Sequence, residues 1–170
     1  VGCRTTDTVA GSTNTYQWIP RSSEEYDAVH AIAQGANAAT RCFQGICVPD
    51  SLATLADLHT PAMLANVFAA GAAYGQYTGA APLVAESNPS LSLNTNAVAL
   101  PADGQPWSRY WIEVFRHAEA VNSGFGAGTG LTPDPTAPFV YRITAIAQGR
   151  KPGSRVILKE TFILNPAAQN

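Results

Sequence analysis

The sequence predicts an α+β fold, with N-terminal helices packed on a C-terminal antiparallel sheet. Apolar residues recur at helical spacing in the first half of the chain and alternate with polar residues near its end. A stretch rich in Pro and Gly separates the two patterns. Helices that precede strands, rather than alternating with them, are typical of α+β domains. We expect one domain over residues 1–170, with a helical part at about 22–78, a loop at 79–107 and the sheet at about 108–165.

The first predicted helix covers about 23–39. Ser22 and Glu25 stand at the spacing of a capping box. Five apolar residues then follow at helical intervals: Tyr26, Val29, Ile32, Ala33 and Ala36. A short second helix is expected in the segment PDSLATLADLH. A third begins at TPAM, where Thr60 caps the helix and Pro61 takes the first helical position.

Strands are predicted in the last third of the chain. In RYWIEVFRH, the side chains of Tyr110, Ile112 and Val114 share one face, and the residues between them share the other. Residues 118–138 are rich in Gly and Pro and form a long connection for a hairpin. The chain then alternates through VYRITAIAQ, turns at Lys-Pro-Gly-Ser and alternates again through RVILKETFIL. This pattern predicts a terminal β-hairpin.

The composition excludes several classes of function. Charged residues make up only 13% of the chain, and the net charge of −2 gives no electrostatic basis for binding nucleic acid or an anionic membrane. No apolar run reaches the roughly 18 residues that span a bilayer. The sequence has no phosphate-binding loop and no nucleophile elbow, and its GFGAGTG segment lacks the spacing of a dinucleotide fingerprint. We therefore expect a protein that is not an enzyme and takes no cofactor.

Residues that commonly carry chemistry are scattered along the chain. The three histidines are isolated and predict no metal site: His30, His59 and His117. A sugar-binding patch of tryptophans is a weaker interpretation than a role in the core or in anchoring loops: Trp18, Trp107 and Trp111. Glu113 and Glu160 are expected on neighbouring strands, where Arg142 and Lys159 complete an ordinary cross-strand charge pattern.

The chain has three cysteines, two of which bracket the segment CFQGIC. Cys42 and Cys47 favour a disulfide loop in an oxidising compartment over a pair of reduced, buried thiols. Loop entropy does not select the pairing, since a Cys42–Cys47 loop is worth about 2 kcal/mol and a Cys3–Cys42 loop about 4 kcal/mol. Because Cys42 and Cys47 are close and Gly45 suits a tight turn, we predict their bond, with Cys3 unpaired or paired only between chains.

Four segments occur in the order CFQGIC, AAYGQYTGAAPLV, QPWSRYWIEVF and YRITAIAQGRKPGSRVILKETFIL. Together they resemble the C-terminal half of minor pilins of the PilX type, from bacterial type IV pilus assembly. The matching positions are Tyr74, Thr78, Gly79, Ala80, Arg109, Tyr110, Ile112, Glu113 and the run Tyr141 to Ala145. The resemblance covers about 42–164. It departs from the pattern at Ile146, where a small residue is usual, and at Glu160-Thr161, where Gln-Ser is common.

This resemblance implies a structural, non-catalytic subunit that primes the pilus fibre and lies near its tip. Such pilins begin with a long hydrophobic helix that anchors them in the inner membrane, so we expect the chain, which starts at Val1, to be the headgroup without that helix. The implied partners are other minor pilins, the major pilin and a tip adhesin. The implied location is the periplasmic face of the bacterial inner membrane and the extracellular pilus.

The last strand is the candidate site for docking a partner. As a sheet edge it would be protected against unwanted pairing by Lys159 and Glu160. A partner pilin would bind there by adding a strand, next to Val156 and Leu158. Three alternatives remain open from the sequence: a pseudopilin of type II secretion, a tip-located adhesin or carbohydrate-binding module, and a small hydrolase with an unrecognised nucleophile.

Overall fold

The computed structural model describes residues 19–20, 22–38, 40–49, 61–73, 99–117, 133, 135 and 138–163. These residues form helices and strands, so the predicted α+β class is confirmed. In chain order the elements are α1 (Ser23–Ala36), β1 (Cys42–Phe43), β2 (Ile46–Cys47), α2 (Pro61–Ala70), β3 (Trp107–Arg116), β4 (Phe139–Gln148) and β5 (Arg155–Ile163).

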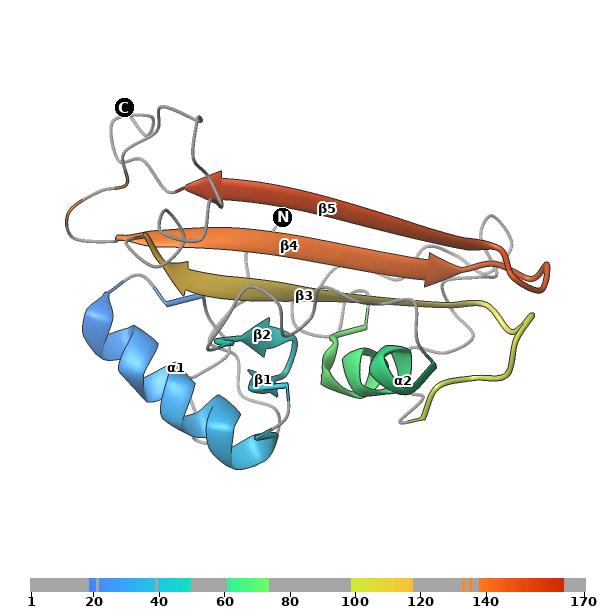
Figure 1. Ribbon diagram of the computed structural model, residues 1–170, viewed down its shortest axis with the longest axis horizontal. Helices are drawn as coiled ribbons and strands as arrows, with labels where there is room; N and C mark the ends of the chain where they lie inside the picture. The colour runs from blue at the N-terminus through green and yellow to red at the C-terminus, as the bar shows by residue number, and fades with distance from the viewer. Residues whose placement is uncertain are drawn as a thin grey trace.

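The strands form one sheet in the order β1-β2-β3-β4-β5 (Figure 1). The three long strands are antiparallel, as predicted, with Ile112 opposite Ile143 and Ile143 opposite Glu160. β2, however, runs parallel to β3, so the sheet is mixed rather than purely antiparallel. The prediction missed β1 and β2 because a strand of two residues has no alternating pattern to detect.

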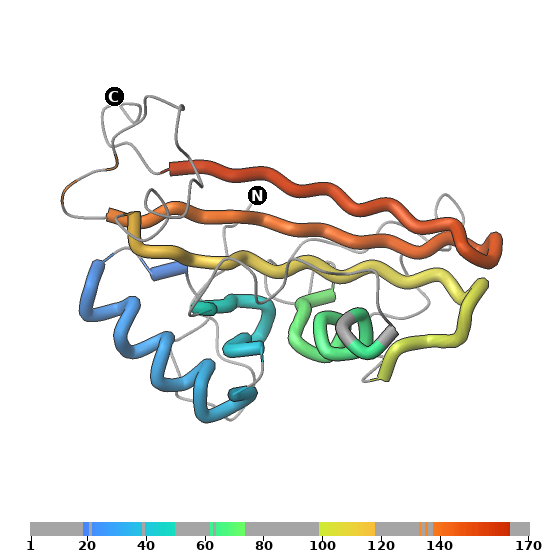
Figure 2. Tube along the Cα trace, in the orientation of Figure 1, coloured from blue at the N-terminus to red at the C-terminus, as the bar shows by residue number. Residues whose placement is uncertain are grey.

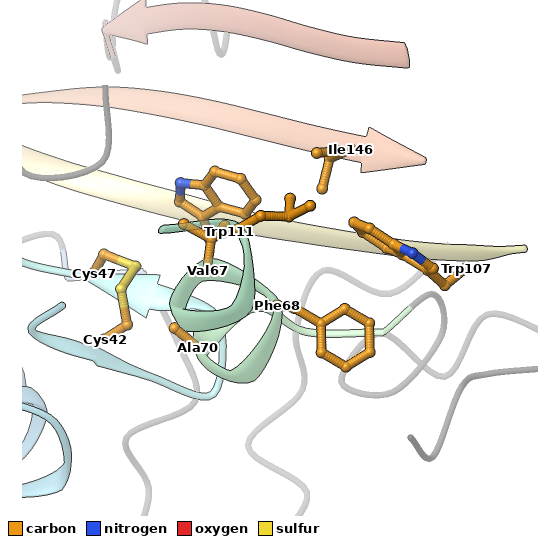
Figure 3. Packing of buried hydrophobic residues seen from close by; sticks show 9 residues of the cluster. Cys42, Cys47, Val67, Phe68, Ala70, Trp107, Trp111 and Ile146 are labelled. Carbon is orange, nitrogen blue, oxygen red and sulfur yellow. A yellow bond between two sulfur atoms is a disulfide. The ribbon is translucent and has the colours of Figure 1, made fainter. Parts of the chain in front are cut away.

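The two helices cover opposite faces of this sheet. Alternate residues of a strand point to opposite faces. One face, here termed the α1 face, packs Ile112, Val114 and Tyr141 against Tyr26 and Val29 of α1. The opposite face, termed the α2 face, has its own core cluster, which joins residues of α2 to the long strands (Figure 3): Leu64, Val67, Phe68, Ala70, Trp107, Trp111, Ile146 and the disulfide cysteines. The two faces predicted for β3 are therefore the ones found.

The helices start where the sequence predicts but end earlier. The Ser22 hydroxyl accepts a hydrogen bond from the Glu25 backbone N–H at 3.2 Å, as expected of the capping box. α1 then ends at Ala36 because Asn37, its C-cap, leaves the helical conformation. α2 begins at Pro61 and ends at Ala70 rather than continuing toward Tyr74.

The end of α2 is set by contact with the sheet. Ala72 and Tyr110 exchange two backbone hydrogen bonds, of 2.8 and 3.0 Å. This isolated bridge pulls the chain out of the helix and onto the free edge of β3, beside β2. The same edge accepts Gly45, whose carbonyl receives the N–H of Ile112 at 2.8 Å. Two segments from the first half of the chain thus share one edge of β3.

Gly45 stands where these segments come closest. Its φ is +76°, a conformation that side chains disfavour, and a Cβ at this position would lie 2.7 Å from the Cβ of Ala72. Its N–H donates to the carbonyl of Ala70 at 3.0 Å, so it also ties the β1–β2 turn to the end of α2. A residue without a side chain is therefore required here for two reasons: the positive φ of the β1–β2 turn and the close contact with Ala72.

A buried ion pair links β3 and β4 on the α2 face. Arg142 donates from Nη2 to Oε1 of Glu113 at 2.6 Å and from Nε to Oε2, while its guanidinium lies over the ring of Phe115. The expected neighbour relation between Glu113 and Glu160 is wrong, because β4 separates their strands and the two side chains point to opposite faces. Slipping the register by one residue would part the buried charges and leave both unpaired.

Several expectations lie outside the described residues. They concern the helix expected in PDSLATLADLH, the cap at Thr60, most of the loops at 79–107 and 118–138, and the individual residues Cys3, Trp18, His59 and Tyr74.

Replacing Gly45 with Ala tests the contact at the edge of β3. Gly153 provides a matched control, because its φ is +74° and an added Cβ would meet nothing within 4 Å. We expect Gly153→Ala to lower the free energy of unfolding by about 1 kcal/mol from backbone strain alone. Gly45→Ala adds a steric clash, for a total of about 3 kcal/mol. Urea denaturation of both variants measures the difference, and equal losses would contradict the close approach.

Candidate functional site

β5 forms one outer edge of the sheet, with β4 on its inner side (Figure 2). All of its residues are exposed or half-buried, in contrast to the buried pattern of β3. Two large apolar side chains are strongly exposed: 59% of Val156 and 66% of Leu158. A strand that leaves both an edge and apolar side chains open is the feature expected of an interaction site.

The hydrogen-bonding pattern shows which backbone groups of β5 face outward. At the hairpin, the Gly149 N–H donates to the Ser154 carbonyl at 3.0 Å, so these opposite residues occupy a hydrogen-bonded position of the ladder, while the Ser154 N–H donates within the turn to the Lys151 carbonyl at 2.9 Å. Such positions alternate along an antiparallel ladder, so Val156, Leu158 and Glu160 also bond toward β4. The backbone groups of the residues between them point away from β4. The free edge therefore presents donors and acceptors from Ile157, Lys159 and Thr161.

An apolar groove of about 180 Å³ lies beside this edge. Its lining residues are Ser108, Arg109, Tyr110, Ala145, Ile146, Ala147, Val156 and Leu158. The register places most of these side chains on the α1 face, at the end of the sheet that α1 does not cover. Burial falls along β4 in the same direction, from Tyr141 through the half-buried Ala145 to the exposed Ala147. Small side chains in the middle strand make the floor of the groove, and the larger ones of β5 make its outer wall.

The two charged residues in the middle of β5 have no charged residue directly opposite them on β4. Lys159 lies opposite Thr144, and Glu160 lies opposite Ile143. Both side chains are exposed, and within the described part of the chain neither forms an ion pair or hydrogen bond. They project to opposite faces, Glu160 on the α1 face beside the groove and Lys159 on the α2 face. These charges are therefore available to a partner.

The other residues singled out from the sequence have structural roles. Cys42 and Cys47 form a disulfide and lie in the core on the α2 face, where they close the β1–β2 turn. Trp107 and Trp111 are each only 1% exposed, so the alternative of a sugar-binding patch is wrong for these two residues. His30 lies 3.0 Å from Arg41. Among the described residues there is no cluster of three or more potential metal ligands.

A family model described as Type IV pilus assembly protein PilX C-term matches residues 5–164. The chain belongs to the PilX family. The match starts well before residue 42, so it also covers N-terminal residues that the resemblance seen in the sequence left unassigned. Searches of curated proteins and of solved structures gave no significant match.

Membership of the PilX family identifies a type IV pilus assembly protein and agrees with the resemblance to minor pilins. The family is a structural component of type IV pilus assembly. Within the described ranges, no helix is long and apolar enough to cross a membrane. The exposed strand and its groove are thus features of a protein that works in an assembly.

The sequence indicated the edge strand but not the groove. Its alternation and its Lys-Glu pair pointed to an exposed strand. The groove forms because Tyr110, Ala145 and Val156 lie side by side on three neighbouring strands. It also requires that α1 does not extend over this end of the sheet. A run of alternating small residues in β4, Ala145 and Ala147, was the only available signal, and it is too common to predict a groove.

Replacing the two exposed apolar residues tests whether they serve the fold. We expect the double variant Val156→Thr with Leu158→Thr to change the free energy of unfolding by no more than about 0.5 kcal/mol, because both side chains already face solvent. Ile146→Thr, at a residue 2% exposed on the α2 face, is the control and should lose about 2 kcal/mol or more. Urea denaturation compares them. A large loss in the double variant would show that these side chains are needed for folding.

Proposed function

We propose that this PilX-family chain is a non-catalytic minor pilin that primes the type IV pilus fibre and lies near its tip. The observation that carries the proposal is the open edge of β5 beside an apolar groove. A structural subunit needs a surface that holds a neighbour, and this edge combines backbone groups that no described strand pairs with exposed apolar side chains.

A partner would dock by adding a strand to β5. The outward backbone groups of Ile157, Lys159 and Thr161 would bond to its main chain, which supplies affinity without dependence on sequence. Its alternate side chains would rest on Val156 and Leu158 and extend the apolar wall of the groove. The candidate docking residues are therefore Val156, Leu158, Lys159 and Glu160.

The partners that fit this role are other minor pilins, the major pilin and a tip adhesin. We place the subunit at the periplasmic face of the bacterial inner membrane during assembly and in the extracellular pilus afterwards. The disulfide between Cys42 and Cys47 supports this location, because such bonds persist in oxidising compartments. We also propose that residues 1–170 act as one domain.

A proline at Thr161 tests docking without disturbing the fold. The Thr161 side chain is exposed and its N–H points away from β4, so proline removes only an outward donor there. We expect Thr161→Pro in the full-length protein to fold but to reduce the number of pili per cell. Thr161→Ala, which keeps the N–H, should support normal pili. The measurements are pilus counts by electron microscopy and the level of the variant protein.

Glu160→Pro is the control that distinguishes the outward edge of β5 from the edge bonded to β4. The Glu160 side chain is also exposed, but its N–H points toward β4, so proline there breaks the ladder that holds β5. This variant should be unstable and fail to accumulate. Normal piliation by a stable, folded Thr161→Pro variant would rule out the β5 edge as a docking site.

A further inference from the structure

We propose that the β5 edge discriminates between partners by charge: it disfavours a second copy of this chain and accepts an extended strand of another chain with the opposite charge order. The inference rests on the proposed docking at β5. It follows from the position of Lys159 and Glu160 at the centre of the open strand, where neither is neutralised from β4.

Symmetry restricts how two copies can pair through this edge. Homodimers are usually two-fold symmetric, and the same patch then meets itself. When two identical antiparallel edges join into one sheet, the two-fold axis is perpendicular to the sheet, so each face continues into the same face of the copy. Directly opposite residues must point to the same face. The residue on the axis therefore lies opposite itself.

The longest symmetric register is unfavourable for this sequence. The central residue of β5 (Arg155–Ile163) is Lys159, so the register that pairs the whole strand sets Lys159 opposite Lys159 of the copy. Moving the axis to Glu160 sets two carboxylates opposite each other. Moving it to Leu158 sets Glu160 opposite Val156 and Lys159 opposite Ile157. Each of these registers places like charges opposite each other or places charged residues opposite aliphatic ones. The two registers whose axis is not at Lys159 also pair fewer residues of β5.

A strand from a different chain escapes this restriction. Running antiparallel to β5, it would place a basic residue opposite Glu160 and, one position later, an acidic residue opposite Lys159. Aliphatic residues would then follow opposite Leu158 and Val156, two positions apart, on the side of the groove. The complementary segment thus reads basic, acidic, aliphatic, any residue, aliphatic. This order defines the partner by its chemistry.

Two peptides of equal composition test the charge order. Val-Thr-Lys-Glu-Val-Thr-Val complements β5 from Phe162 back to Val156, and Val-Thr-Glu-Lys-Val-Thr-Val carries the charges in the wrong order. We expect the first to bind the wild-type protein about tenfold more tightly at low salt, because two cross-strand pairs change from opposite to like charge. The double variant K159E/E160K should reverse this preference. Fluorescence anisotropy with labelled peptides, repeated at high salt, measures the ratios.

Reversal of the preference supports the inference. Equal affinities of the two peptides, or failure of the complementary peptide to bind, overturns the charge selectivity. The proposed function is tested separately, because pilus counts with Thr161→Pro and Thr161→Ala depend on the edge backbone and not on this charge order. Selectivity can therefore fail while docking at β5 stands.

Mixing two versions of the folded chain tests the exclusion of a second copy. Wild type alone sets Lys opposite Lys at the centre of the full register, and the K159E variant alone sets Glu opposite Glu. Their equimolar mixture sets Lys opposite Glu. Sedimentation equilibrium should show an association constant about fivefold higher for the mixture than for either protein alone. Equal association in all three samples would show that Lys159 does not exclude self-pairing.

Discussion

The structure depends on β3, because this strand is covered on both faces and paired on both edges. Its α1 face packs against α1, and its α2 face packs against α2 and the disulfide. One edge bonds to β4 over its whole length, and the other receives Gly45 and Ala72. Each helix packs against residues of this strand as well as against its neighbours in the sheet. The ion pair between Glu113 and Arg142 fixes the register with β4, and that register decides which residues meet on each face.

This arrangement also determines where the protein is open. The edge of β3 is closed by short segments from the first half of the chain, whereas the opposite side of the sheet ends at β5. α1 covers only the end of its face near Val114 and Tyr141, so the groove lies at the other end, next to Val156 and Leu158. An open edge and an uncovered apolar surface thus occur together. For a member of a pilus assembly family, this is the part of the described structure most suited to hold a neighbouring subunit.

Charges on an edge strand can serve two purposes with the same residues. Lys159 and Glu160 lie at the middle of β5, where edge charges oppose aggregation in natural sheets. Because they have opposite signs and point to opposite faces, they also define one complementary order in a partner. The energy of each cross-strand pair is small, but two-fold symmetry makes every unfavourable pair off the axis occur twice. A strand from a different chain can instead place an opposite charge beside both Lys159 and Glu160. Selectivity can thus arise without a deep binding site.

The sequence by itself determined the features that depend on near neighbours. The cap at Ser22, the start of α2 at Pro61, the faces of β3 and the terminal hairpin follow from periodicity and turn residues. Only the tertiary structure decided that β2 lies parallel to β3, that Glu113 and Arg142 form a buried ion pair with Glu160 two strands away, and that the helices occupy opposite faces. These features join residues far apart in the chain, and local patterns carry no information about such distances. The groove beside β5 belongs to the same group, since three strands and the end of α1 must meet to form it.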